Sequence, residues 1–206
     1  MITLWGRLNS VNVQKVVFCL EEIGAPYERV EAGLQFGVVD TPDYRAMNPN
    51  GLVPTLRDGD LVLWESNAIL RYLCAAHATG RLWPASPAAR AAGDRWMDWQ
   101  QTAFAPAMFR AFHDLVRKPP EQRDAGAVEE SRKATEKRLA VLDAALAAAP
   151  WLGGADFGAA EFAVAPHVHR WLNMPVERQS RPALEEWYQR VMDRPAAQRA
   201  LTLPIT

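Results

Sequence analysis

The sequence predicts an α/β domain followed by an all-helical domain, and three observations support this division. Short β-prone runs alternate with helical segments over residues 1–80, whereas only helical periodicity appears after residue 87. Residues 81–87 between them hold two prolines and a serine, the composition of a linker. We therefore expect domains at 1–80 and 88–206.

Composition narrows the classes of function. The 206 residues are 49% hydrophobic and 23% charged, which is ordinary for a globular protein. The formal net charge of −1 gives no electrostatic basis for binding nucleic acid or an anionic membrane. No apolar run approaches a membrane span, and the first residues lack the features of a signal peptide. Cys19 and Cys74 show no metal or redox spacing. We expect a soluble, cytoplasmic protein.

The first elements form a βαβ unit. Residues 2–5 are predicted as a strand, a helix starts after Ser10 and ends at Gly24, and residues 26–30 form a second strand. Strand, helix and strand follow within about thirty residues, so the two strands should be parallel. The helix is supported by apolar residues at helical spacing, namely Val13, Val16, Val17, Leu20 and Ile23.

A β-hairpin and a further helix complete this domain. Residues 53–56 and 61–64 are short apolar runs, with the hairpin signal Asp58-Gly59 between them. Pro54 cannot donate a ladder hydrogen bond, so its strand should lie at an edge or begin there. Ser66 is a candidate N-cap for the next helix. With a short helix expected near 42–46, the order βαβ–α–ββα is that of a thioredoxin-like domain.

The second half is predicted to be entirely helical. Pro106 is expected to kink or break its first long helix, and the charge-poor helix near 159–172 is expected to be buried. The predicted helices are 88–115, 128–149, 159–172, 182–192 and 195–201.

The block NPNGLVP at residues 48–54, followed by the hairpin and Glu65-Ser66, resembles the glutathione-binding half of cytosolic glutathione S-transferases. The resemblance implies a cis Pro54, although sequence statistics alone favour trans. It also implies that the Val53 backbone pairs with the cysteinyl unit of glutathione, as in strand addition. Glu65 and Ser66 would hold the γ-glutamyl end, where a helix N-terminus favours a carboxylate.

A segment of the second half extends the resemblance over the whole chain. Residues 157–162 look like the family's buried helix start, in which Ser or Thr caps the helix and Asp follows three residues later. Here Gly158 replaces the hydroxyl residue and Glu161 replaces the Asp. Glu161 can still accept from the cap N–H, but the reciprocal side-chain bond is lost. This motif is interpreted as structural.

In the family, the protein lowers the pKa of the glutathione thiol, and the thiolate is the nucleophile. The matching stretch, residues 7–16, contains no Tyr and no Cys. Two hydrogen-bond donors remain, Ser10 and Asn12, and the resemblance to serine- and asparagine-type (theta- and nu-like) members leaves both open, with a slight preference for Ser10. Arg7 could attract an anionic substrate or the glycine carboxylate of glutathione.

The resemblance also implies a pocket for the electrophile on the first long helices. The candidate residues there are Phe109, Arg110, His113 and Arg117. His167 and His169 do not share a helix face, and no carboxylate pattern lies nearby, so no metal site is predicted.

The resemblance implies conjugation of glutathione, as co-substrate, to a small hydrophobic or halogenated electrophile such as an alkyl halide, in a homodimer that serves detoxification. Three alternatives stay open. The chain could be another glutathione-dependent enzyme, such as a dehalogenase, isomerase or peroxidase. It could bind glutathione without turnover. It could also use only the fold, as a structural or interaction protein.

Overall fold

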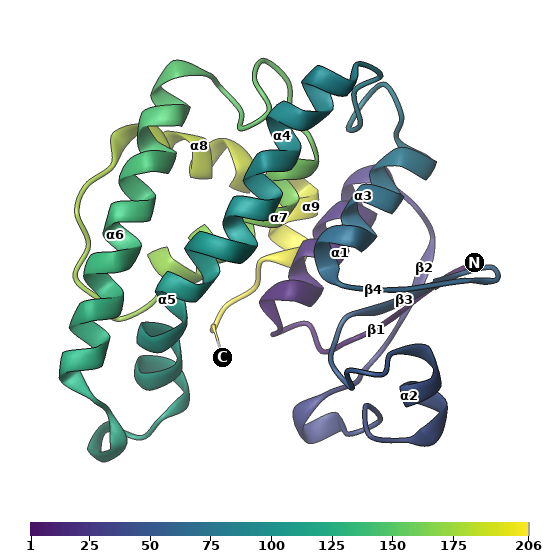
Figure 1. Ribbon diagram of the computed structural model, residues 1–206, viewed down its shortest axis with the longest axis horizontal. Helices are drawn as coiled ribbons and strands as arrows, with labels where there is room; N and C mark the ends of the chain where they lie inside the picture. The colour runs from purple at the N-terminus through teal and green to yellow at the C-terminus, as the bar shows by residue number, and fades with distance from the viewer. Residues whose placement is uncertain (206) are drawn as a thin grey trace.

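The computed structural model, which describes residues 1–205, places an α/β half beside a helical half (Figure 1). The strands form one sheet in the order β2-β1-β3-β4. β1 pairs in parallel with β2, as the βαβ pattern predicts, and antiparallel with β3, which pairs antiparallel with β4. The strands are β1 (Ile2–Trp5), β2 (Tyr27–Val30), β3 (Thr55–Asp58) and β4 (Leu61–Trp64).

Helices cover both faces of this sheet. α1 (Val11–Ile23) and α3 (Ser66–His77) lie on one side, and α2 (Pro42–Met47) lies on the other (Figure 1). Leu4 and Leu56 are fully buried and come from the two central strands. The α/β domain therefore has the thioredoxin-like arrangement that the order of elements predicted.

The hairpin begins later than its apolar run suggests. The Val53–Pro54 peptide bond is cis, and β3 starts at Thr55. A proline has no N–H for the ladder, which explains why the strand begins after Pro54 and not at Val53. β3 lies inside the sheet, so the alternative of an edge strand is excluded.

The start of α3 corrects the prediction for Ser66. Ser66 is the first helical residue, and Glu65 occupies the N-cap position with φ +69° and ψ 110°. A non-glycine residue in this region of backbone space is strained, typically by about 1–3 kcal/mol. The chain thus turns sharply between β4 and α3, which places Glu65 and Ser66 side by side at the helix N-terminus.

Pro106 does not break its helix, which excludes one of the two effects expected from the sequence, a break or a kink. α4 (Pro87–Trp99) runs into a π-helical turn at Gln100–Phe104 and then into α5 (Ala105–Phe112) without interruption. The π turn shifts the hydrogen-bond pattern just before the proline, where the missing N–H and the ring would otherwise disturb an α-helix. A second π turn, His113–Arg117, follows.

The remaining helices match the predicted ones to within a few residues. α7 is the central helix of this half, buried along nearly its whole length, and α1 packs against both α7 and α9 (Figure 1). The helices are α6 (Ala125–Ala148), α7 (Ala159–Leu172), α8 (Pro182–Met192) and α9 (Pro195–Ala200), with 3₁₀ turns at Leu34–Phe36 and Pro120–Gln122. Within residues 1–205, no helix has the length and apolar character needed to cross a membrane.

The start of α7 is held by a buried carboxylate. Glu161 accepts hydrogen bonds from the backbone N–H groups of Gly158 (2.9 Å) and Leu152 (2.7 Å), and it is fully buried. Burial raises the pKa of Glu161 to about 7. Glycine at the cap contributes no side-chain acceptor, and the bond from the Gly158 N–H to Glu161 is the one that the motif predicted.

Replacing Glu161 by alanine should destabilise the protein by roughly 2–6 kcal/mol, because two buried N–H groups each lose their acceptor. Urea denaturation at pH 6 measures this, and Glu130→Ala on the exposed face of α6 is the control. A loss no larger than in the control would contradict the role of Glu161.

Because the folded-state pKa is raised above the ordinary 4.5, the contribution of this carboxyl to stability is complete below about 4.5 and declines as the pH rises towards 7.

Candidate active site

Two adjoining cavities lie at the junction of the α/β and helical halves. The smaller, of about 60 Å³, is lined by residues of the hairpin block, and the larger, of about 360 Å³, reaches α5 and α7. Asn12, Glu65 and Ser66 line both cavities. A ligand bound at the N-terminus of α3 would therefore face both spaces.

The smaller cavity contains an extended segment with an unpaired backbone. Among residues 1–205, the N–H and C=O groups of Val53 form no hydrogen bond with the chain. The preceding carbonyl of Leu52 is fixed by the Tyr44 hydroxyl (2.7 Å) and by Asn48 Nδ2 (2.9 Å). A rigid loop thus presents one unsatisfied backbone unit, which is what recognition by strand addition requires.

Ser66 connects the N-terminus of α3 to α1. Its hydroxyl donates to Asn12 Oδ1 at 3.4 Å and accepts from Lys15 Nζ at 3.4 Å. Gln101 Nε2 donates to Glu65 Oε2 at 3.4 Å, so a residue of the helical half contacts the same turn. The turn between β4 and α3 is therefore held from both halves of the molecule.

Lys15 is a residue that the sequence interpretation missed. It is 1% exposed, and its ammonium donates to Gln100 Oε1 (2.7 Å) and Asn67 Oδ1 (3.2 Å) as well as to Ser66. Burial lowers the pKa of Lys15 to about 7, and the Glu65 carboxylate opposes this shift. A signal existed in the sequence: Lys15 shares a helical face with Phe18 and Cys19, three and four residues on.

The two candidate sulfur ligands have different surroundings. Ser10 occupies the N-cap position of α1, is 8% exposed and lines the larger cavity, yet its side chain forms no cap hydrogen bond. Asn12 already accepts the hydrogen bond of Ser66. A hydroxyl that is not used to cap its helix can serve as a donor to a ligand.

Aromatic side chains form one side of the larger cavity. Phe109 and His113 stack with ring centroids 5.8 Å apart, and both line it together with Arg117. Arg110 lies outside this cavity, because its guanidinium pairs with the carboxylates of Asp114 (3.3 Å) and Asp124 (3.7 Å). The candidates from the first long helices are thus divided between the cavity and the outer surface.

Two further arginines lie in the larger cavity. Arg7 lines it, and within residues 1–205 it is not among the groups that line the smaller cavity. Arg170, which the sequence interpretation did not single out, comes from the buried helix α7. An arginine in an otherwise charge-poor helix was the signal that could have identified it.

The two histidines of α7 have separate partners, and His167 also lines the larger cavity. His167 contacts Gln100 Nε2, and burial together with the charges of Lys15 and Arg170 holds its pKa well below 6.5. His169 bonds to the Tyr188 hydroxyl at 2.7 Å. Each ring is engaged in a separate packing contact.

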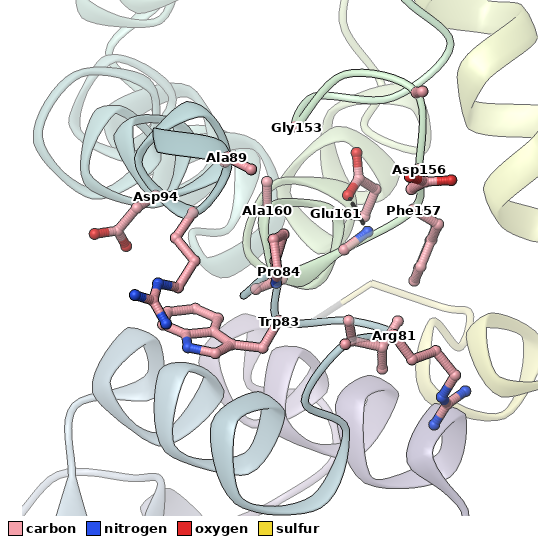
Figure 2. Close-up of a pocket in the computed structure, with 17 residues that line it drawn as sticks. Arg81, Trp83, Pro84, Ala89, Asp94, Gly153, Asp156, Phe157, Ala160 and Glu161 are labelled. Carbon is pink, nitrogen blue, oxygen red and sulfur yellow. Dashed lines mark hydrogen bonds between the residues drawn. The ribbon is translucent and has the colours of Figure 1, made fainter. Parts of the chain in front are cut away.

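Another cavity, of about 300 Å³, lies where the linker meets α4 and the start of α7 (Figure 2). Two of its polar side chains have structural partners: Asp94 binds Arg71 at 2.5 Å, and Glu161 caps α7. None of the predicted site residues lines it within the described chain. It is a feature of the joint between the two halves.

The thioredoxin-like domain presents an unpaired backbone unit before a cis proline, and the helical domain completes a second cavity beside it. Together these features are those of the glutathione-binding transferases. The family models for the N-terminal and C-terminal domains of glutathione S-transferase match residues 1–75 and 125–190. The chain belongs to the glutathione S-transferase family.

Individual relatives agree with this assignment. The chain is 47% identical to the glutathione S-transferase GstB of Escherichia coli over the full length of both chains. It is 30% identical to the disulfide-bond oxidoreductase YfcG of the same organism, over 92% of this chain and 90% of that one. The crystal structure of a theta class glutathione S-transferase from Xanthomonas axonopodis pv. citri with glutathione bound superimposes with a TM-score of 0.96 at 47% identity, covering 100% of this chain and 99% of that one.

Proposed function

We propose that this protein binds glutathione along Val53 and the N-terminus of α3, where the smaller cavity adjoins the larger one, and transfers its thiolate to a small electrophile, such as an alkyl halide, held in the larger cavity. The observation that carries the proposal is that Asn12, Glu65 and Ser66 line both cavities. Shared lining residues matter because the nucleophile and the electrophile must come within reacting distance.

The binding step follows from the groups of the smaller cavity. Val53 offers its N–H and C=O to the cysteinyl backbone, and cis Pro54 follows it directly. The γ-glutamyl carboxylate would lie at the N-terminus of α3, where Ser66 and the helix dipole favour an anion. Glu65 would receive the ammonium group of the same unit.

The chemical step needs a stabilised thiolate. In this proposal the Ser10 hydroxyl donates to the sulfur, and Asn12 is the alternative donor. The N-terminus of α1 adds positive potential, which lowers the thiol pKa further. The thiolate then attacks the carbon that bears the leaving group, and the halide departs with its electron pair.

The proposal is tested by incubating the protein with glutathione and an alkyl halide and measuring the thioether by mass spectrometry. A rate well above the uncatalysed reaction supports it. Binding of glutathione with no acceleration would indicate a glutathione carrier instead of an enzyme.

We also propose a cytoplasmic homodimer with a role in detoxification, as the family resemblance implies. Sedimentation measures the oligomeric state.

Ser66→Ala should weaken glutathione binding by about 10- to 100-fold, because a hydrogen bond to a charged group contributes about 1.5–3 kcal/mol. Isothermal calorimetry measures the dissociation constant, and Ser180→Ala on the exposed segment before α8 is the matched control. Equal affinity in the Ser66 variant and the control would remove Ser66 from the site.

A further inference from the structure

The larger cavity carries a strong excess of positive charge. Among the described residues that line it, the cationic side chains are Arg7, Lys15, Arg117 and Arg170. Glu65, at the mouth shared with the smaller cavity, is the carboxylate among them. A pocket for neutral apolar compounds has no need of these charges, and the buried guanidinium of Arg170 in particular is costly without an anion.

Arg170 is the most buried of the three arginines. It is 7% exposed, and its guanidinium carbon stands 3.9 Å from the centre of the Phe112 ring. Its Nη2 donates to the Asn9 carbonyl at 3.3 Å, while its Nε is buried without a partner in the described chain. The side chain is therefore fixed in place with part of its donor capacity unused.

Arg117 and Arg7 converge on the same space. The guanidinium of Arg117 lies 5.3 Å from the same Phe112 ring, so two cations share one aromatic neighbour. The Nε of Arg7 is also buried without a partner in the described chain. Burial and the charge of Arg117 lower the pKa of Arg7, and burial with the charges of Arg117 and Arg7 lowers the pKa of Arg170 to about 9.

Building on the proposed function, we propose that the electrophile carries a carboxylate, which Arg7, Arg117 and Arg170 bind in the larger cavity. One anion would neutralise these positive charges, which repel one another. It would accept hydrogen bonds from the planar guanidinium groups, the geometry that arginine favours for carboxylates. The aromatic pair Phe109 and His113 would cover the carbon skeleton.

The reaction is then a displacement on a haloalkanoate. The glutathione sulfur forms a bond to the carbon next to the carboxylate, and the carbon–halogen bond breaks with release of halide. No oxidant or reductant is needed, because the sulfur supplies the electron pair of the new bond and the halide keeps the pair of the broken one. The thiol proton leaves to solvent before the attack. The arginines orient the substrate so that its halogen-bearing carbon faces the smaller cavity, where the thiolate would lie.

The test compares two electrophiles of nearly equal size and different charge, iodoacetate and its neutral amide, iodoacetamide. For the wild type, we expect kcat/KM, divided by the uncatalysed rate constant, to favour iodoacetate by at least about tenfold. In Arg117→Gln and Arg170→Gln this preference should fall by about tenfold or more. Arg110→Gln, which removes an arginine that lies outside the cavity, is the control and should retain the preference.

Each other outcome contradicts a stated part of the proposal. Acceleration of both compounds without a preference for iodoacetate would overturn the carboxylate inference and leave the proposed function intact. No acceleration of either would contradict the proposed function itself. Weaker glutathione binding by calorimetry in the arginine variants, with the preference unchanged, would assign the arginines to the glycine carboxylate of glutathione and overturn the inference.

Discussion

Ser10→Ala is expected to lower kcat/KM for glutathione conjugation by about 10²–10³-fold, the loss found when one donor to a developing or bound anion is removed from a closed site. The hydroxyl lies in the larger cavity and does not cap its helix, so the fold of α1 does not depend on it. Without this donor the pKa of bound glutathione should rise, and the rate should recover partly at higher pH.

A neighbouring residue of the same site supplies the control variant for this prediction. Asn12→Ala removes the acceptor of the Ser66 hydrogen bond, so it should weaken glutathione binding more than it changes the thiol pKa. If Ser10→Ala leaves the pH profile unmoved while Asn12→Ala shifts it, Asn12 is the sulfur ligand and the assignment of Ser10 is wrong.

Lys15→Met is expected to weaken glutathione binding by about 10²-fold. The ammonium holds Ser66, Asn67 and Gln100 together directly behind the N-terminus of α3, and its charge favours an anionic γ-glutamyl group there. Because the pKa of Lys15 is about 7, binding of the anion should weaken in the wild type as the pH rises through this value. Calorimetry from pH 6 to 8.5 measures both effects.

A stability measurement separates this role from simple damage to the core. The folded-state pKa of Lys15 is lowered from 10.5 to about 7, so the unfolded chain binds more protons between these values. The contribution of Lys15 to the free energy of unfolding therefore rises with pH across this window, and Lys15→Met should flatten that rise. Exposed Lys137→Met is the control. An unchanged pH slope with full glutathione affinity would contradict the proposed position of Lys15.

The fold could be predicted from the sequence because the sequence features that indicate it are local. The βαβ spacing, the Asp58-Gly59 turn and the helical periodicity each depend on residues close in the chain, and the strands and helices formed where these signals lie. The errors occurred where tertiary context overrides a local rule. The strained Glu65 moved the start of α3 to Ser66, and a π turn accommodated Pro106 inside a continuous helix.

The candidate site could be predicted from the sequence only in part. The hairpin block and Ser10 to Asn12 could be found because they form motifs within short stretches. Arg170 and Gln100 are far from that motif in the sequence and reach it through packing of α7 and the π turn against α1. Residues such as these become visible only when burial and charge are known together, since an arginine or glutamine on a helix is ordinarily solvated.

The central claim is that this chain binds glutathione and lowers the pKa of its thiol. The most direct test is the ultraviolet absorbance of the thiolate, titrated across pH for the purified protein with saturating glutathione and compared with free glutathione. We expect the bound thiol to ionise at clearly lower pH than the free thiol, whose ordinary pKa is about 8.5. Saturable binding with an unshifted titration would contradict the account.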